Sequence, residues 1–445
     1  MYLKEIAKKG KGNLIGPSAK INKVNIDTRS LEPGDLFVAI KGDRHDGHDF
    51  LDDAIAKGAS SLVVEKKLNN NLPQIVVKNT LQFLKDLAKA NCNEFNGDLI
   101  CITGSNGKTT TKEMISIMLS SQGLTHKTIG NKNNLIGMPL SVADLDQRYK
   151  YSVVELGTSA KGEIKELNSI AKPSVAIITN VSAAHLNGLE SLDEIVSEKG
   201  SILNFANNSG IAILPYDSPY FNLWSEKTNA KEIISFGVTK GSDFTLSDVK
   251  INLLENSTSF NVSNKNSIHK CKINGVGFHN ALNATAAIAT CSSLDMKLSE
   301  VIQELERIQF PVRRLSVHKG FKGSMLIDDT YNSNPESMKR AIDLLNHAGS
   351  LTKIIAVGEM GELGYQSEDL HKEVCIYAKN KVDHFFCIGE LWASGIRDFN
   401  ENGLIFKNQN ELINHLKSII DSNSCILLKG SRSTRMDLVA DKFII

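Results

Sequence analysis

The sequence predicts an α/β protein of three domains: a small N-terminal α/β domain, a central domain with a parallel sheet, and a C-terminal Rossmann-like domain. Short apolar runs alternate with helical patterns along the chain, which is typical of parallel sheets covered by helices. The alternation restarts after Phe310-Pro311, where proline restricts the residue before it. A chain of 445 residues has room for about three domains. We therefore expect domains at 1–79, 80–310 and 311–445.

The elements of the first domain alternate between short strands and helices. Its expected strands are 24–26, 36–40, 61–64 and 75–77, with a helix at 50–57. A helical stretch at 81–95 then leads to the first strand of the central domain.

The central range alternates most strongly. Its expected strands are 99–102, 151–156 and 175–179, and its expected helices are 112–121, 163–170, 192–204 and 280–291. Residues 243–275 are rich in Ser, Asn and Thr with alternating apolar positions, which predicts antiparallel strands at one edge of the sheet. In the last domain, strands are expected at 325–327, 353–357, 384–388 and 425–429.

Composition excludes several classes of protein. The formal net charge of +1 argues against a nucleic-acid binder that relies on bulk charge. No apolar run approaches the ~18–20 residues that span a bilayer, and the N-terminus lacks the apolar core of a signal peptide. The seven cysteines are scattered without a Cys-x-x-Cys pair, so neither a disulfide framework nor a zinc cluster is indicated. We expect a cytoplasmic protein without membrane insertion.

The most informative segment is the glycine-rich stretch that follows the apolar run at 99–102. A strand, a glycine turn and a helix N-terminus together form a nest for phosphates. Lys108 is expected to reach the β- and γ-phosphates, and Thr109 to place its hydroxyl on Mg²⁺. The standard P-loop pattern has a glycine five positions before Gly107, where Ile102 stands, so the loop is a compact variant. The central domain is therefore predicted to be a P-loop ATPase domain, with nucleotide-binding residues Gly104, Ser105, Asn106, Gly107, Lys108, Thr109 and Thr110.

Three further residues are candidates for chemistry. Glu155 and His185 follow expected strands at their carboxyl ends, the edge where ligands bind in open α/β sheets. A carboxylate there suits Mg²⁺, although taken alone it is more often a solvated strand end. A lone histidine is more often structural, and Lys199 on its helix would ordinarily face solvent.

In this order, the loop, Glu155, His185 and Lys199 resemble the Mur ligase family, ATP-dependent ligases that form amide bonds in peptidoglycan synthesis. The asparagine-rich segment 131–139 and the helix start at 279–283 resemble further family motifs. The resemblance implies nucleotide-binding roles for Asn133, Asn134, Asn280, Asn283, Arg314 and Asp329. The stretch 429–432 is similar to the family's late C-terminal motif.

Within the family, the chain resembles the members that add D-alanyl-D-alanine to a UDP-N-acetylmuramoyl tripeptide. The stretches that carry this likeness are 27–30, 33–39, 42–50, 328–338 and 358–364. The resemblance implies substrate-binding roles for Thr28, Arg29, Ser30, Asn332 and Asn334. Either diaminopimelate or lysine fits as the third residue of the acceptor peptide.

The resemblance also implies a mechanism through an acyl phosphate. ATP and two Mg²⁺ ions are the expected cofactors, with Thr109, Glu155, His185 and Lys199 as metal ligands and Lys108, Lys199, His185 and Glu155 as catalytic residues. Lys199 can bind a cation only as a carbamate, because an ordinary lysine is protonated at neutral pH. A nucleotide held by both the second and the third domain is expected to draw them together during turnover. A monomer is expected.

Two alternatives remain. Another ligase of the superfamily, such as a different Mur ligase or a folylpolyglutamate synthase, shares the loop, but the folate enzymes lack the N-terminal nucleotide-sugar domain. A P-loop nucleotide-hydrolysing binding module is the alternative from another class. It predicts hydrolysis without an amino-acid co-substrate, and the Asn280/Asn283 helix start and the Arg314/Asp329 pair speak against it.

Overall fold

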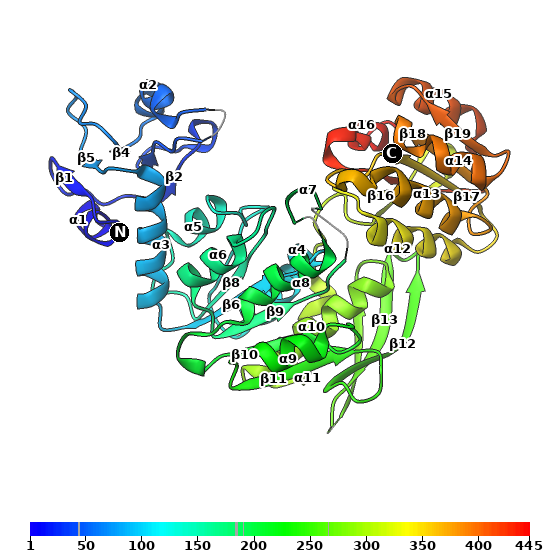
Figure 1. Ribbon diagram of the computed structural model, residues 1–445, viewed down its shortest axis with the longest axis horizontal. Coiled ribbons are helices and arrows are strands. Elements are labelled where there is room, and N and C mark those ends of the chain that lie inside the picture. Colours follow the sequence, from blue (N-terminus) through cyan, green and yellow to red (C-terminus); the bar gives the residue numbers. More distant parts are fainter. Residues whose placement is uncertain (43–44, 183–185, 190, 266) are drawn as a thin grey trace.

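The computed structural model describes residues 1–42, 45–182, 186–189, 191–265 and 267–445, which form three units, each built on its own sheet. The N-terminal and C-terminal units lie at opposite ends of the long axis, with the central unit between them (Figure 1). Each sheet falls within one predicted domain range, and the α/β class is confirmed. The boundaries after residues 79 and 310 stay predictions.

The N-terminal unit is a five-stranded sheet in the order β1-β5-β4-β3-β2, parallel except for β1. Its strands are β1 (Asn13–Ile15), β2 (Val24–Asn25), β3 (Leu36–Val38), β4 (Ser61–Val64) and β5 (Gln74–Val76), with helices α1 (Leu3–Lys9) and α2 (Leu51–Ala56). Helix α3 (Thr80–Glu94) joins this unit to the next. Phe83 and Leu87 of α3 lie in the N-terminal core, whereas Ala88 and Cys92 lie in the central core, so both units pack on one helix.

The central unit is a nine-stranded sheet in the order β14-β13-β12-β11-β10-β9-β6-β8-β7. Its strands are β6 (Asp98–Thr103), β7 (Thr125–Lys127), β8 (Tyr151–Glu155), β9 (Val175–Ile178), β10 (Ile211–Pro215), β11 (Glu232–Gly237), β12 (Phe244–Asn252), β13 (Ser257–Ser263) and β14 (Ile268–Ile273). The last three form the predicted antiparallel edge.

Helices cover both faces of the central sheet. Alternate side chains of β6 divide between two cores: Ile100 and Ile102 face one, Leu99 and Cys101 the other. The helices are α4 (Lys108–Ser120), α5 (Gly137–Val142), α6 (Glu163–Ala171), α7 (Leu186–Leu189), α8 (Leu192–Gly200), α9 (Phe221–Lys227), α10 (Phe278–Ser293) and α11 (Leu298–Val301). This three-layer arrangement directs the carboxyl ends of β6, β8 and β9 to one edge.

The C-terminal unit is a six-stranded sheet in the order β15-β16-β20-β17-β18-β19, parallel except for β15. Its strands are β15 (Ser316–Lys319), β16 (Met325–Asp329), β17 (Thr352–Gly358), β18 (His384–Ile388), β19 (Gly403–Phe406) and β20 (Ser424–Lys429). Its helices are α12 (Pro335–Leu345), α13 (Ser367–Ala378), α14 (Ala393–Phe399), α15 (Gln409–Ile419) and α16 (Met436–Ala440).

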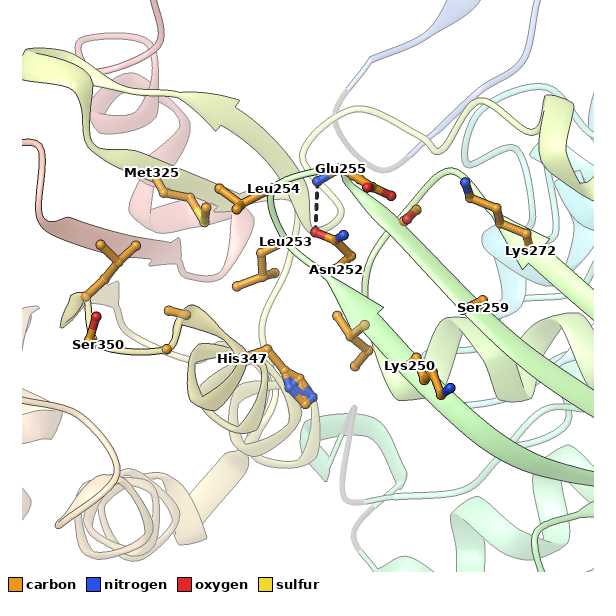
Figure 2. A pocket seen from close by; sticks show the side chains of 15 residues that line it. Lys250, Asn252, Leu253, Leu254, Glu255, Ser259, Lys272, Met325, His347 and Ser350 are labelled. Atoms are coloured by element: carbon orange, nitrogen blue, oxygen red, sulfur yellow. Dashed lines mark hydrogen bonds between the residues drawn. The ribbon is translucent and has the colours of Figure 1, made fainter.

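The turn between β12 and β13 joins the central and C-terminal units. Leu253 at its tip is buried within the C-terminal core, beside Ile327 and Met338. Figure 2 shows the neighbouring cavity of about 690 Å³, with Leu254 and Met325 on one side and His347 on the other. None of the predicted site residues lines this cavity. It belongs to the contact between two units.

Candidate active site

The glycine-rich loop connects β6 to α4 and is held open by two glycines in left-handed conformations. Gly104 has φ +153° and Gly107 has φ +81°. A Cβ at Gly107 would lie 2.5 Å from Oδ1 of Asn283, the residue predicted here from the α10 motif. Helix α4 begins at Lys108, four residues before the predicted start at Lys112. Gly107 caps the helix and allows it to start there. The first turn, 108–111, is polar and has no apolar periodicity from which the earlier start could be predicted.

The predicted metal ligands Thr109 and Glu155 lie side by side. The Thr109 hydroxyl donates to Oε2 of Glu155 at 2.9 Å, and Nδ2 of Asn133 donates to Oε1 at 2.7 Å. The backbone N–H of Glu155 donates to the hydroxyl of Thr128 at 3.1 Å, which fixes the end of β8. Glu155 is buried. A buried carboxylate next to a hydroxyl provides the hard oxygen ligands that Mg²⁺ binds.

Both predicted catalytic lysines donate to one backbone oxygen. The Nζ of Lys108 lies 2.8 Å and the Nζ of Lys199 lies 3.1 Å from the carbonyl oxygen of Gly104. Lys199 is buried, so the solvent-facing alternative is wrong. Burial lowers the pKa of Lys199 well below its ordinary value, and the nearby Lys108 ammonium lowers this pKa further. Burial also lowers the pKa of Lys108, and the nearby Glu155 partly offsets this decrease.

The first residue of the Arg314/Asp329 pair reaches the loop from beyond the second predicted boundary. The guanidinium of Arg314 donates to the hydroxyl of Thr109 at 3.3 Å and lies 4.1 Å from the ring centre of Tyr331. Asp329 accepts hydrogen bonds from Lys429 and from the backbone of Leu315. Burial raises the pKa of Asp329.

Three other predicted nucleotide-binding residues lie in α10, before α5 and in α4. Asn280 donates to the Val276 carbonyl at 2.7 Å and, with Arg314, lines a cavity of about 300 Å³. Asn134 lies before α5, and its Oδ1 accepts the N–H of Gly137 at 2.8 Å. Thr110 is buried in α4.

The predicted substrate residues divide between the two outer units. Thr28–Ser30 form a single 3₁₀ turn in the N-terminal unit, in which Arg29 pairs with Asp27 at 2.7 Å. The Asn332 carbonyl accepts from Lys429 at 2.9 Å, and Asn334 caps α12. The arrangement brings Asn334 to the loop and leaves Thr28–Ser30 in another unit. His185 lies outside the described residues.

The residues that sequence reasoning missed follow β9 and lie on α8. The hydroxyl of Thr179 and Nδ2 of Asn180 both donate to the Asn106 carbonyl, at 2.6 and 2.9 Å. The buried Glu198 accepts the N–H groups of Gly162 and Ile164, each at 2.7 Å, and so ties α8 to α6. Thr179 and Asn180 follow a predicted strand, so the same-edge argument that selected Glu155 could have found them.

Family models and known proteins match this chain over most of its length. The Mur ligase family catalytic domain matches residues 20–91, the Mur ligase middle domain residues 102–291, and the Mur ligase glutamate ligase domain residues 313–432. A curated relative from Buchnera aphidicola, "UDP-N-acetylmuramoyl-tripeptide--D-alanyl-D-alanine ligase", is 34% identical and aligns over 100% of this chain and 98% of its own. The chain belongs to the Mur ligase family.

Solved structures agree with that membership. A crystal structure of MurF from Acinetobacter baumannii superimposes on this Mur ligase with a TM-score of 0.89 and 31% identity, covering 99% of this chain and 98% of the other. MurF ligase from Thermotoga maritima in complex with ADP gives a TM-score of 0.83 at 28% identity, over 95% and 96% of the two chains.

Within the described residues, no helix has the length and apolar character needed to cross a membrane. The described part of this Mur ligase also holds no group of three or more His, Cys, Asp or Glu side chains that could bind a metal ion. If Thr109 and Glu155 bind a cation as predicted, they would supply only part of its ligands. This fits Mg²⁺, which is usually bound through one or two carboxylates together with substrate phosphates.

Proposed function

We propose that this protein is an ATP-dependent ligase that joins D-alanyl-D-alanine to a UDP-N-acetylmuramoyl tripeptide in peptidoglycan precursor synthesis. The observation that carries the proposal is the full-length similarity to ligases named for that reaction, at 34% identity. The loop geometry supports it, because Lys108, Thr109 and Glu155 gather at the carboxyl edge of the sheet.

The reaction needs a carboxylate to attack the γ-phosphorus of ATP. One carboxylate oxygen bonds to phosphorus and ADP leaves, which gives an acyl phosphate. The amine of D-alanyl-D-alanine then adds to the acyl carbon, and phosphate leaves with the bridging oxygen. Both partners of the first step are negatively charged, so the site must neutralise charge and align the groups.

The residues of the site divide this work. The backbone N–H groups at the start of α4 and the Lys108 ammonium bind the β- and γ-phosphates. Arg314, Asp329, Asn280 and Asn283 hold the rest of the nucleotide between the central and C-terminal units, and the cavity of about 300 Å³ beside Asn280 and Arg314 supports this. Asn133 orients Glu155 through its hydrogen bond to Oε1.

Thr109 and Glu155 would hold one Mg²⁺, and Glu155, His185 and a carbamylated Lys199 would hold a second. Bound Mg²⁺ supplies charge neutralisation for the phosphates. The buried Lys199 supports carbamylation, because a lowered pKa leaves the neutral amine that adds to CO₂. Carbamylation would convert that amine into an anionic oxygen ligand.

The other parts of the proposal concern the whole chain. We assign the domains to 1–79, 80–310 and 311–445, with Thr28, Arg29 and Ser30 contacting the UDP end of the acceptor and Asn332 and Asn334 its peptide end. We place the monomeric enzyme in the cytoplasm. The seven cysteines are all free and buried, in agreement with a reducing compartment.

A phosphate-release assay tests the proposal. The enzyme is incubated with ATP, Mg²⁺ and UDP-N-acetylmuramoyl tripeptide, and the amine is varied. We expect release that depends on D-alanyl-D-alanine, together with the mass of the joined product. Release with glutamate or diaminopimelate, but not with D-alanyl-D-alanine, would contradict it. Release without any amine would favour the nucleotide-hydrolysing module.

A further inference from the structure

The phosphate loop is joined to the C-terminal unit through the side-chain amides of Asn106 and Asn334. Nδ2 of Asn334 donates to Oδ1 of Asn106 at 2.8 Å, and Nδ2 of Asn106 lies 3.5 Å from Oδ1 of Asn334. The two residues are 228 positions apart in the chain. Asn106 stands inside the loop, between the N–H donors that the nucleotide phosphates need.

The orientation of the Asn334 amide is fixed by its second role. Its Oδ1 accepts the N–H of Ser337 at 2.8 Å, and the Ser337 hydroxyl accepts the N–H of Asn334 at 3.0 Å, which completes a capping box at α12. Since the cap requires the oxygen to face α12, the NH₂ group must point away from the helix, toward the loop.

Asn106 is fixed on its other sides by the central unit. Its backbone N–H donates to Oδ1 of Asn180 at 3.0 Å, and its carbonyl oxygen accepts from Thr179 and Asn180. Its own Nδ2 donates to the Ser182 hydroxyl at 3.2 Å. Among the described residues, the Oδ1 of Asn106 has no partner in the central unit and accepts from Asn334, so it is the atom through which the C-terminal unit acts on this part of the loop.

We infer that Asn334 is a positioning residue for the phosphate loop: it holds Asn106 from the C-terminal unit and so couples ATP affinity to the seating of that unit. Asn334 then contributes to nucleotide binding without touching the nucleotide. The inference rests on the proposed function only in taking the loop as the ATP site.

A substitution that keeps the cap and removes the contact tests this inference. Serine caps helices as well as asparagine does, so Asn334→Ser retains α12 and loses the donor to Asn106. Because one neutral hydrogen bond contributes roughly 0.5–1.5 kcal/mol, we expect the Kd for ATP to rise roughly 2- to 10-fold. The matched control is Asn408→Ser, since Asn408 caps α15 in the same unit by accepting the N–H of Glu411.

The measurement is calorimetric titration of the full chain with ATP and Mg²⁺, without acceptor or amine, in a cycle with Asn106→Ser. We expect the double variant to bind ATP no more weakly than the Asn106→Ser single variant. The inference would be overturned if the increases in Kd caused by Asn334→Ser and Asn106→Ser multiply in the double variant. It would also be overturned if Asn334→Ser and Asn408→Ser bind ATP with the same Kd. If Asn334→Ser does not fold, Asn334→Thr, which also keeps a capping hydroxyl, replaces it.

Turnover with all three substrates gives a second readout. We expect Asn334→Ser to raise the KM for ATP with a smaller change in kcat, a split that loss of a helix cap alone would not produce. A chain that binds ATP with the expected coupling but makes no amide would contradict the proposed function and leave this inference standing.

Discussion

The role proposed for Lys199 is one that its residue type does not suggest. A buried amine beside another lysine is disfavoured as a cation. Its Nζ shares the Gly104 carbonyl oxygen with Lys108, and burial lowers its pKa well below the ordinary value. Glu198, the preceding residue, is committed to the backbone of α6. The lowered pKa favours the neutral amine, which is the form that the proposed carbamylation of Lys199 requires.

We predict that Lys199→Ala lowers the rate of D-alanyl-D-alanine ligation by a factor on the order of 10²–10³, the usual effect of removing a group that stabilises transition-state charge. The wild-type rate should also fall when bicarbonate is removed from the buffer. The exposed Lys165→Ala serves as the control. Full activity in the Lys199→Ala enzyme would refute carbamylation at this site.

At the scale of elements, the connection from β6 to α4 depends on the backbone of Gly107. Its φ of +81° lies in the left-handed region, and a side chain there would also meet Asn283. Gly162 provides a matched position: it precedes α6 with φ +90°, and a Cβ there would meet nothing within 4 Å.

We predict that Gly107→Ala weakens ATP binding at least about tenfold, whereas Gly162→Ala does not. Both substitutions should lower the free energy of unfolding by about 1–3 kcal/mol, because an alanine at either position is strained at a positive φ. Only the first displaces Asn283. Titration with ATP and thermal unfolding of both variants separate the two effects, and equal ATP affinities would show that the loop tolerates a side chain.

The elements with strong local signals were predictable from the sequence. The apolar run at 99–102 predicted β6. The expected strand at 151–156 placed Glu155 at the carboxyl end of β8, and β8 pairs with β6 in the structure. Strands β10 and β11 were not predicted, and β15 and β19 were missed among their flanking loops. Leu253 could not be foreseen in the C-terminal core, because a turn residue's burial depends on a contact that no local pattern encodes.

At the scale of the whole molecule, a partly buried carboxylate joins the N-terminal and central units. Asp144, after α5, accepts the N–H of Val24 in β2 at 3.1 Å. Burial raises the pKa of Asp144 to about 6 from 3.8. Between these values the folded state binds more protons than the unfolded state, so this group's contribution to stability falls as pH rises from about 4 to about 6.

We therefore predict that Asp144→Asn, which keeps an oxygen for Val24, stabilises the protein above pH 6 and changes little near pH 4. The gain should approach about 2–3 kcal/mol, as a shift of about two pKa units implies. Denaturant unfolding at the two pH values measures it. A gain that is larger at pH 4 than at pH 7 would contradict the assignment.

The contact of Arg314 with Thr109 also bears on the motion of the whole chain. A nucleotide held by both units is expected to draw the C-terminal unit further onto the loop. Solution scattering with and without a non-hydrolysable ATP analogue should show a smaller radius of gyration in its presence, and an unchanged radius would count against closure.

The central claim is that this site transfers phosphate to a carboxylate before the amide forms. Labelling the acceptor's terminal carboxylate with ¹⁸O tests it most directly, because the bridging oxygen leaves with phosphate. We predict one ¹⁸O atom in each phosphate released during ligation of D-alanyl-D-alanine, measured by mass spectrometry. Phosphate that carries no label from the acceptor would contradict the acyl-phosphate mechanism and with it the assigned roles of the loop.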